Sequence, residues 1–466
     1  MGSSAAKDSD EPLTPAGRLF LQPNTNQVIH CVMGVKNPIE IDSMKALIRD
    51  SLLLQHPRFT SLLVRDHRGF EHWRRTQIDI DRHIKVIHGP VAGAGVDDQS
   101  AINDYLAELS IDASSISADK PLWEIHLLIA HNCLILRIHH ALGDGISLMA
   151  MLLASCRKVE DPEATPTLFS LNRKKSRGGN WKDWRKLWGL VVTVWFCVVF
   201  AIEFAVRCLW VRDRRTAISG GAGVEQWPRK IATARFRLED MKAVKMAVAG
   251  ATINDVLFAI ISSGLSRYLD FRASDGLQDG LRLTGLAMVN LRPQEGLQVD
   301  LSNLMRSNSR ARWGNKFGMI LLPVSYHRSD CSDPLEHLKR AKAMIDRKKQ
   351  SLEAHFSYTV GDFVMSTLGP KYASLLNYRI VCNTSFTISN VVGPQEEIMI
   401  GGNPITFLRA INSALPHALT LNMVSYAGMA DMQIQVAKDI IPDPEFLAKC
   451  FEDALLEMKD HAVAKS

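Results

Sequence analysis

Two adjacent histidines, followed by an aspartate and a glycine, are the residues of this chain best suited to chemistry. Residues 139–145 read HHALGDG. An imidazole has an unperturbed pKa near neutrality, so it can accept a proton from an alcohol or a thiol without extreme tuning. The apolar run before the pair predicts a strand, in which successive side chains face opposite ways. His140 then shares a face with Ile138, whereas His139 shares one with Arg137, so the two histidines cannot have the same role.

The pattern HHxxxDG resembles the motif of the CoA-dependent acyltransferase superfamily, which includes chloramphenicol acetyltransferase and the condensation domains of peptide synthetases. Further blocks resemble those of the wax ester synthase/diacylglycerol acyltransferase family, in particular its plant branch. In chain order these blocks are Pro121-Leu122-Trp123-Glu124, Asn254-Asp255, Asn290-Leu291-Arg292-Pro293, Gly314-Asn315 and Ser389-Asn390-Val391-Val392-Gly393-Pro394. The resemblance extends from Pro12 to about Pro444.

The resemblance implies that His140 is the general base. It would take the proton of a bound alcohol while the alcohol oxygen attacks the thioester of acyl-CoA, and the tetrahedral oxyanion would collapse to an ester and the CoA thiol. No covalent acyl-enzyme is needed, because a thioester is already activated. The alternative is a core histidine with no chemical role, which the surrounding motif disfavours. His139 is expected to be a supporting, structural residue.

Asp144 and Gly145 complete the motif. Asp144 could orient His140 as the acid of a triad, or it could hold the turn by pairing with an arginine. In the superfamily this aspartate points away from the histidine, and an aspartate before a glycine at a helix start is a natural cap. We therefore expect a structural role for Asp144, and the sequence does not identify its arginine partner. Gly145 suits a close backbone approach and is a candidate contact of CoA.

The second half of the chain offers two further candidates. Asn254 lies at a predicted helix start, where amide groups could donate to an oxyanion or a substrate carbonyl, or where it could serve only to cap the helix. Arg292 is a candidate for an ion pair or for contact with the phosphates of CoA. The eight cysteines form no CxxC pair, so we expect free thiols and no metal site. No cofactor is expected, with acyl-CoA acting as co-substrate.

Residues 12–168 predict the first α/β lobe, which carries the motif. Its predicted helices cover residues 41–54, 98–109 and 146–156, and its predicted strands cover residues 60–66, 71–73, 122–130 and 133–138. A turn at His131-Asn132 would pair the last two strands. Residues 1–11 are small and polar, which predicts a disordered N-terminus.

Residues 169–224 form a basic and hydrophobic linker, with a predicted helix at about 187–210. Leu187–Ile202 carries no charge, Glu203 interrupts the apolar run, and about 20 apolar residues are needed to cross a bilayer. Flanking tryptophans and basic residues suit lipid headgroups, so we expect a membrane helix in preference to a buried core helix. A single span would separate two halves that share one site, so a helix embedded in one leaflet or a re-entrant helix fits better.

Residues 225–466 predict the second lobe. Thr252 and Asp255 have the spacing of a capping box at the start of a helix. Predicted strands cover residues 281–290, 319–324, 384–391, 418–426 and 432–437, and a final helix follows. Strands and helices interleave in both halves, which predicts an α/β fold with mixed sheets. The resemblance implies two chloramphenicol-acetyltransferase-like lobes that share an active-site tunnel.

The net charge of +6 is modest, and its basic excess clusters between Arg173 and Arg215, which favours a membrane surface over nucleic acid. The resemblance implies an enzyme that joins long-chain acyl-CoA to a long-chain fatty alcohol, giving a wax ester, and to diacylglycerol, giving triacylglycerol. It also implies the endoplasmic reticulum membrane, with the lobes on the cytosolic side and the plasma membrane as a second location. The alternatives are a lipid-binding membrane protein whose catalysis has lapsed and a condensation enzyme that depends on a carrier protein.

Overall fold

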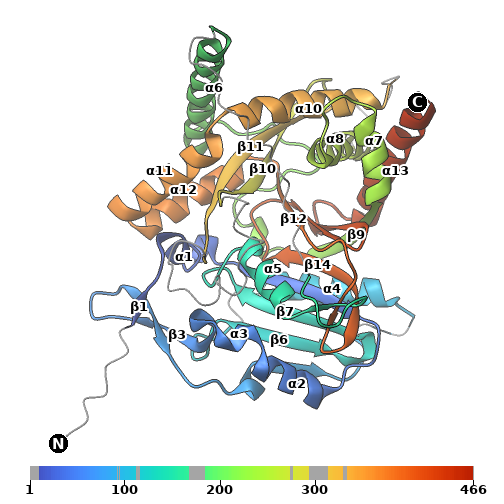
Figure 1. Cartoon of the computed structure of the whole chain (residues 1–466). Coiled ribbons are helices and arrows are strands. Elements are labelled where there is room, and N and C mark those ends of the chain that lie inside the picture. The colour runs from blue at the N-terminus through green and yellow to red at the C-terminus, as the bar shows by residue number, and fades with distance from the viewer. Residues whose placement is uncertain are drawn as a thin grey trace, which may run out of the picture.

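The computed structural model describes residues 10–464 except for 92, 94, 112–115, 167–183, 273–276, 293–312 and 329–332. Most of the predicted N-terminal disorder and the first part of the predicted linker lie outside the described residues. The rest forms two α/β lobes, each built around one mixed β-sheet (Figure 1). The predicted fold class is therefore confirmed.

The first lobe contains a seven-stranded sheet that carries the two histidines. Its strand order is β5 (Ile84–Ile87), β6 (Trp123–Leu128), β7 (Cys133–His139), β2 (Val28–Val35), β14 (Asn403–Asn412), β13 (Ile398–Ile400) and β8 (Arg157–Lys158). A smaller sheet joins β1 (Glu11–Pro12), β4 (Glu71–Arg75) and β3 (Ser61–Arg65). The helices of this lobe are α1 (Pro15–Leu19), α2 (Ile41–Asp50), α3 (Leu52–Gln55), α4 (Asp98–Ile111) and α5 (Gly145–Ala154). The helix predicted over 41–54 is two helices, because Ser51 adopts an extended conformation between them.

Two strands of this sheet come from the far end of the chain. β14 pairs antiparallel with β2, in a register that joins Val35 to Ile405 and Ile29 to Asn412. Gly34 permits this approach, since a Cβ atom there would lie 2.2 Å from the ring of Phe407. The predicted lobe 225–466 thus gives β13 and β14 to the sheet of the predicted lobe 12–168, and the two lobes are not two consecutive stretches of chain.

The second lobe has a six-stranded sheet with helices packed against it. Its strand order is β11 (Phe317–Ser325), β10 (Arg282–Asn290), β12 (Phe386–Val392), β15 (Leu419–Tyr426), β16 (Met429–Ala437) and β9 (Arg229–Arg237). The helices are α7 (Leu238–Met246), α8 (Ile253–Arg272), α10 (Leu335–Gln350), α11 (Glu353–Thr367), α12 (Pro370–Asn383) and α13 (Pro444–Ala464). All five predicted strands and the final helix are present. Phe236, Ile260 and Phe451 lie in its core and are at most 1% exposed.

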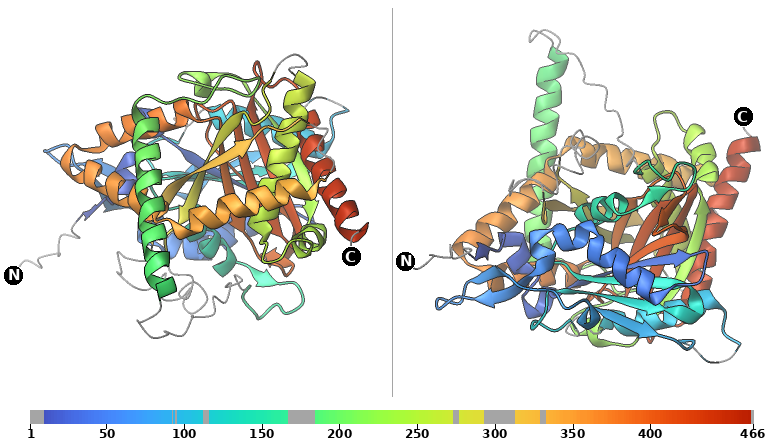
Figure 2. Two further views of the ribbon diagram at one scale, coloured as in Figure 1. Left: turned by 90° about the horizontal axis from the view of Figure 1, so that it is seen from above. Right: turned by 60° about the horizontal axis from the view of Figure 1, so that its bottom comes forward.

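The predicted linker helix is α6 (Trp184–Leu209), which stands out from the body beside α11 and α12 (Figures 1 and 2). Residues 188–209 are long and apolar enough to cross a membrane, and only 6% of their most apolar stretch is buried. The alternative of a buried core helix is therefore wrong. Only the C-terminal end of α6 packs into the body, where Phe204, Arg207 and Cys208 are buried.

Candidate active site

His140 lies one residue beyond β7, at the end of the apolar strand. Its backbone N–H donates to the carbonyl of Gln27 at 2.8 Å, which extends the pairing of β7 with β2 by one residue. The half-buried ring stacks on Phe20 with the centroids 4.0 Å apart. From the second lobe, Asn315 reaches the ring, with its Oδ1 3.0 Å from Nδ1. His140 thus sits where the two lobes meet.

Asn315 fixes which nitrogen of His140 carries the proton. The Asn315 Nδ2 group donates to the carbonyl oxygen of His140 at 2.8 Å, so the Oδ1 atom must be the acceptor in the second contact. Nδ1 of His140 therefore carries the hydrogen, and Nε2 keeps its lone pair. Burial lowers the pKa of His140 below its usual value, while the charge of Asp144 and the bond to Asn315 act in the opposite direction. A neutral ring with a free Nε2 can act as a general base.

His139 faces the other way and has both ring nitrogens engaged. Nδ1 accepts from the N–H of Ala141 at 3.1 Å, so Nε2 donates to Asn26 Oδ1 at 2.7 Å. Burial, and then the neighbouring His140, lowers the pKa of His139 to about 3. These bonds hold the turn in place and leave His139 no lone pair with which to take a proton.

Asp144 holds the helix start and the loop before β11. Its Oδ1 accepts from the N–H of Ser147 at 3.0 Å, which makes Asp144 the N-cap of α5. Its Oδ2 accepts from the N–H of Lys316 at 3.1 Å and from Arg292 at 2.6 Å. Within the described residues this carboxylate makes no hydrogen bond with the ring of His140.

Arg292 is the arginine partner that the sequence did not identify. Its Nη1 bonds Asp144 and, at 3.2 Å, Asn290 Oδ1, while Nη2 donates to the carbonyl of Gly314. Arg292 and Asp144 are about 10% exposed or less, so the pair is nearly buried. The guanidinium joins the motif of the first lobe to the second lobe. Its suggested contact with CoA phosphates stays a prediction.

Gly145 and Asn254 are the remaining two candidate residues. A Cβ atom at Gly145 would meet only Val391, at an ordinary 3.6 Å, so packing within the protein does not require glycine here. Asn254 is exposed, and its Oδ1 accepts from Asn390 at 2.9 Å. No hydrogen bond joins Asn254 to His140 within the part of the chain that is described. The contacts of these residues with substrate stay predictions.

The helix that follows Asn254 begins as predicted. The N–H of Asp255 donates to Thr252 Oγ1 at 3.3 Å, and the N–H of Thr252 donates to Asp255 Oδ2 at 2.6 Å. This reciprocal pair confirms the capping box. The seven cysteines within the described ranges are free thiols.

A cavity of about 520 Å³ lies next to the residues that contact His140. Its lining includes Asn315, which bonds the ring of His140, and Phe317, whose ring centroid is 6.2 Å from that of His140. The walls come from α1 of the first lobe and from β11, α6, α11 and α12 of the second part of the chain. Most of the lining side chains are apolar, among them Leu19, Phe204, Cys208, Met319, Phe356, Val364, Met365, Leu376 and Ile380. The volume is typical of a site for a small organic ligand.

Sequence reasoning missed two residues that touch His140. Asn315 belongs to the Gly314-Asn315 block, but nothing in that block shows that it reaches an imidazole 175 residues away. Phe20 has no signal in the sequence, because its contact depends on how α1 folds back over β7. Such contacts appear only once the lobes are assembled.

The fold matches solved structures of acyltransferases. The wax ester synthase/diacylglycerol acyltransferase from Marinobacter aquaeolei VT8 aligns with a TM-score of 0.60 at 18% identity, covering 97% of this chain and 99% of that chain. The trichothecene 15-O-acetyltransferase from Fusarium sporotrichioides aligns with a TM-score of 0.59 at 12% identity, covering 96% and 94%. This chain therefore shares the two-lobed fold of these proteins, and its HHxxxDG motif lies where the lobes meet.

Sequence comparisons are more specific. Residues 40–257 match the wax ester synthase/diacylglycerol acyltransferase catalytic domain, and residues 313–459 match the C-terminal domain of the same family. Wax ester synthase/diacylglycerol acyltransferases 5 and 11 of Arabidopsis thaliana are each 36% identical to this chain over 97% of its length, covering 94% and 95% of their own. The chain belongs to the wax ester synthase/diacylglycerol acyltransferase family and is an acyltransferase enzyme.

Proposed function

We propose that this enzyme transfers a long-chain acyl group from acyl-CoA to the hydroxyl of a long-chain fatty alcohol or of diacylglycerol. The products are a wax ester and triacylglycerol. The names of the relatives support these product classes, and the apolar cavity supports a long-chain substrate. The observation that carries the proposal is the ring of His140, whose proton is held on Nδ1 by Asn315, a residue that lines this cavity.

In the proposed reaction, Nε2 of His140 removes the proton of the acceptor hydroxyl as its oxygen attacks the thioester carbonyl. The tetrahedral oxyanion then collapses, the carbon–sulfur bond breaks, and the departing thiolate takes the proton from the imidazolium. The alcohol and acyl-CoA thus give an ester and free CoA with no net change in protons. No resident cofactor is required, since the thioester already carries an activated acyl group.

We also propose that the enzyme works at a membrane, with both lobes on the cytosolic side of the endoplasmic reticulum. The exposed apolar α6 supports membrane contact. A spanning α6 would put residues 10–166 and 210–464 on opposite sides, yet β2 and β14 pair within one sheet. Residues 167–183 include five Lys or Arg side chains and are unsuited to a return crossing. Protease digestion of sealed microsomes tests this, because both lobes should be cleaved from outside.

The enzymatic proposal is tested by ester formation from labelled palmitoyl-CoA and hexadecanol, with and without diacylglycerol. His140→Ala should lose activity by a factor of about 100 to 10,000 while the melting temperature stays near that of the native protein. Equal rates for the two proteins would refute His140 as the base. A native protein that binds lipid but forms no ester would instead support the lapsed, lipid-binding alternative. A rate that requires a phosphopantetheinyl carrier would support the condensation enzyme.

A further inference from the structure

Helices α11 and α12 line the cavity on one side and expose several large apolar side chains on the other. Their inner faces line the cavity, through residues such as Val364 on α11 and Ala373 on α12. Their outer faces leave large apolar side chains in solvent, and Phe363 and Leu368 are 63% and 59% exposed. A helix at the surface of a water-soluble protein normally exposes polar side chains on its outer face. These two helices instead separate an apolar cavity from an outer surface that exposes large apolar side chains.

The base of α6 belongs to the same wall. Phe204 and Cys208 line the cavity, whereas Trp195, two turns nearer the free end, is 65% exposed. Leu209 of α6 and Phe356 of α11 both line the cavity and remain 46% and 37% exposed. Side chains that do both mark the place where the cavity reaches the surface. One opening of the cavity therefore lies between α6 and α11, next to exposed apolar side chains, and Pro15 of α1 and Asp362 of α11 also line the cavity and are exposed.

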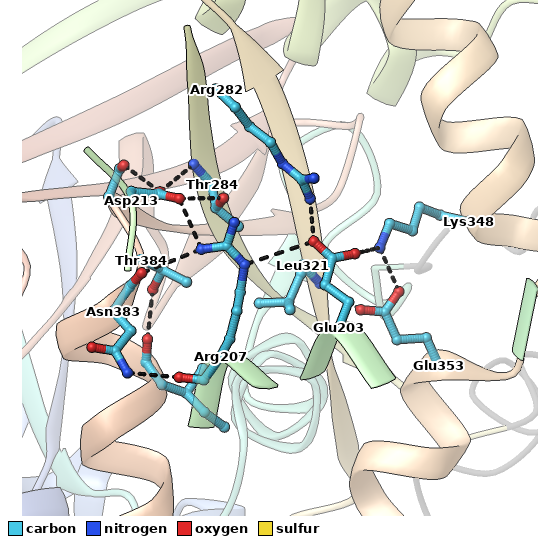
Figure 3. A network of polar contacts seen from close by, with 12 residues as sticks. Glu203, Arg207, Asp213, Arg282, Thr284, Leu321, Lys348, Glu353, Asn383 and Thr384 are labelled. Atoms are coloured by element: carbon cyan, nitrogen blue, oxygen red, sulfur yellow. Dashed lines mark hydrogen bonds and ion pairs between the residues drawn. The ribbon is translucent and has the colours of Figure 1, made fainter. Parts of the chain in front are cut away.

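A network of ion pairs fixes α6 at this position (Figure 3). Glu203 contacts Arg282 and lies 4.0 Å from Lys348, which itself pairs with Glu353 at 2.8 Å. Arg207, one turn on, donates to Asp213 at 2.8 Å. Cys197 accepts from the N–H of Leu352 at 3.2 Å, and Lys348 Nζ lies 3.6 Å from the ring centroid of Phe200, so the contacts of α6 with the body extend from its C-terminal end to Cys197.

The rim of this surface is basic. Asp213 is the single acid of residues 210–215, and it is turned inward, where it also accepts from Thr284 and Ser385. Arg212, Arg214 and Arg215 are left exposed beside Trp210, which is 75% exposed. On α12, Lys371 and Arg379 are also exposed. Tryptophan and arginine around an apolar surface suit the headgroup region of an anionic membrane.

We propose that α6, α11 and α12 form a docking surface for an anionic lipid leaflet, and that the lipid acceptor enters the cavity from this leaflet. Here the docking surface means the exposed apolar side chains of these three helices together with Trp210 and the basic rim. The proposal rests on the proposed function, since it names the route by which the acceptor reaches His140. A fatty alcohol or diacylglycerol would pass between α6 and α11 without crossing water.

The test uses the full chain with Phe363→Glu and Leu368→Glu combined, and Met246→Glu as the matched control. Met246 is 77% exposed at the end of α7, on the side of the second lobe away from α11 and α12 (Figures 1 and 2). Binding is measured by co-sedimentation with vesicles of phosphatidylcholine alone and of phosphatidylcholine with phosphatidylserine. Activity is measured with hexadecanol embedded in the vesicles and with hexanol dissolved in buffer.

The double variant should lose vesicle binding and hexadecanol esterification by about tenfold or more, because two apolar side chains no longer enter the leaflet. Hexanol esterification should stay within about threefold, and the control should behave as the native protein. Trp195→Glu on α6, which is outside the cavity wall, should act in the same direction. Native binding should be stronger to the anionic vesicles and should weaken with salt.

Unchanged vesicle binding in the double variant would overturn the proposal, as would equal losses with hexadecanol and hexanol. A variant that becomes monomeric while its vesicle binding is unchanged would show that this surface joins two copies of the chain, which also overturns it. A native protein that binds vesicles through this surface but esterifies neither alcohol would refute the proposed function and leave the docking surface supported. The two failures are therefore distinguishable.

Discussion

Asn315 should control the rate through the tautomer of His140. Replacing it by Leu removes the acceptor that holds the proton on Nδ1 and the donor to the carbonyl of His140. Leaving a buried polar group without its partner costs about 1–3 kcal/mol, which corresponds to a loss of about 5- to 150-fold in kcat. KM for the acceptor should change less, because the substitution keeps the branching and the number of heavy atoms of the side chain at the cavity wall.

Asn315→Asp separates positioning from packing. The carboxylate still accepts from Nδ1–H, so kcat should fall less than in Asn315→Leu. Its negative charge favours the imidazolium and raises the pKa of His140, so the acidic limb of the kcat/KM profile should move to higher pH. Both variants are assayed with palmitoyl-CoA and hexadecanol across pH. An Asn315→Leu enzyme with native kcat, or an acidic limb that does not move in Asn315→Asp, would refute the reasoning.

Three further substitutions or conditions test the rest of the structure. Arg292→Gln should destabilise the protein by about 3–5 kcal/mol in urea unfolding, since it leaves the nearly buried Asp144 carboxylate unpaired, and Asp144→Asn in the same chain should restore part of the loss. Burial lowers the pKa of His139 and of His417 to about 3, from 6.5. The unfolded chain therefore binds more protons than the folded one between these values, so the urea midpoint should fall from pH 7 to pH 5, and equal midpoints would contradict this. Gly318→Ala should cost about 1–3 kcal/mol and displace α11, because its Cβ atom would lie 1.9 Å from the carbonyl oxygen of Ala354. Gly361→Ala, in open space on α11, is its control and should keep or raise the native melting temperature, because alanine favours a helix over glycine.

The sequence predicted the local elements around the motif better than their assembly. The strand pair before the histidines, α5 and the capping box at Thr252 follow from periodicity and cap residues, which are local signals. The pairing of β14 with β2 cannot be predicted from local signals, because the two strands are more than 350 residues apart and neither sequence pattern specifies its partner. Helices α10, α11 and α12 have no counterpart among the predicted elements. All three contact α6, α11 packs on α12, and α10 and α11 pack on β11, so tertiary contacts settle their helical state and position.

The candidate site shows the same limit. The motif identified His140 and the loop that holds it, and an ion pair was one of two roles predicted for Arg292. That Arg292 pairs with Asp144 depends on bringing together residues 148 positions apart. The proton position on His140 depends on an amide from the other lobe. The type of chemistry could thus be predicted from the residue types, whereas the geometry that leaves Nε2 of His140 as the base depends on the fold.

Glu203 illustrates how burial changes the meaning of a charge. In the sequence it shortens an apolar run and argues against a helix that spans the bilayer. In the structure its side chain is 18% exposed and turns toward Arg207, Arg282 and Lys348, so the charge faces the body and the uncharged part of α6 ends before it. The apolar part from Trp188 to Ile202 then measures roughly 22 Å at about 1.5 Å per residue, which is less than the hydrocarbon core of about 30 Å. A helix of this length, fixed at one end to a body that cannot cross, is suited to lying within a single leaflet.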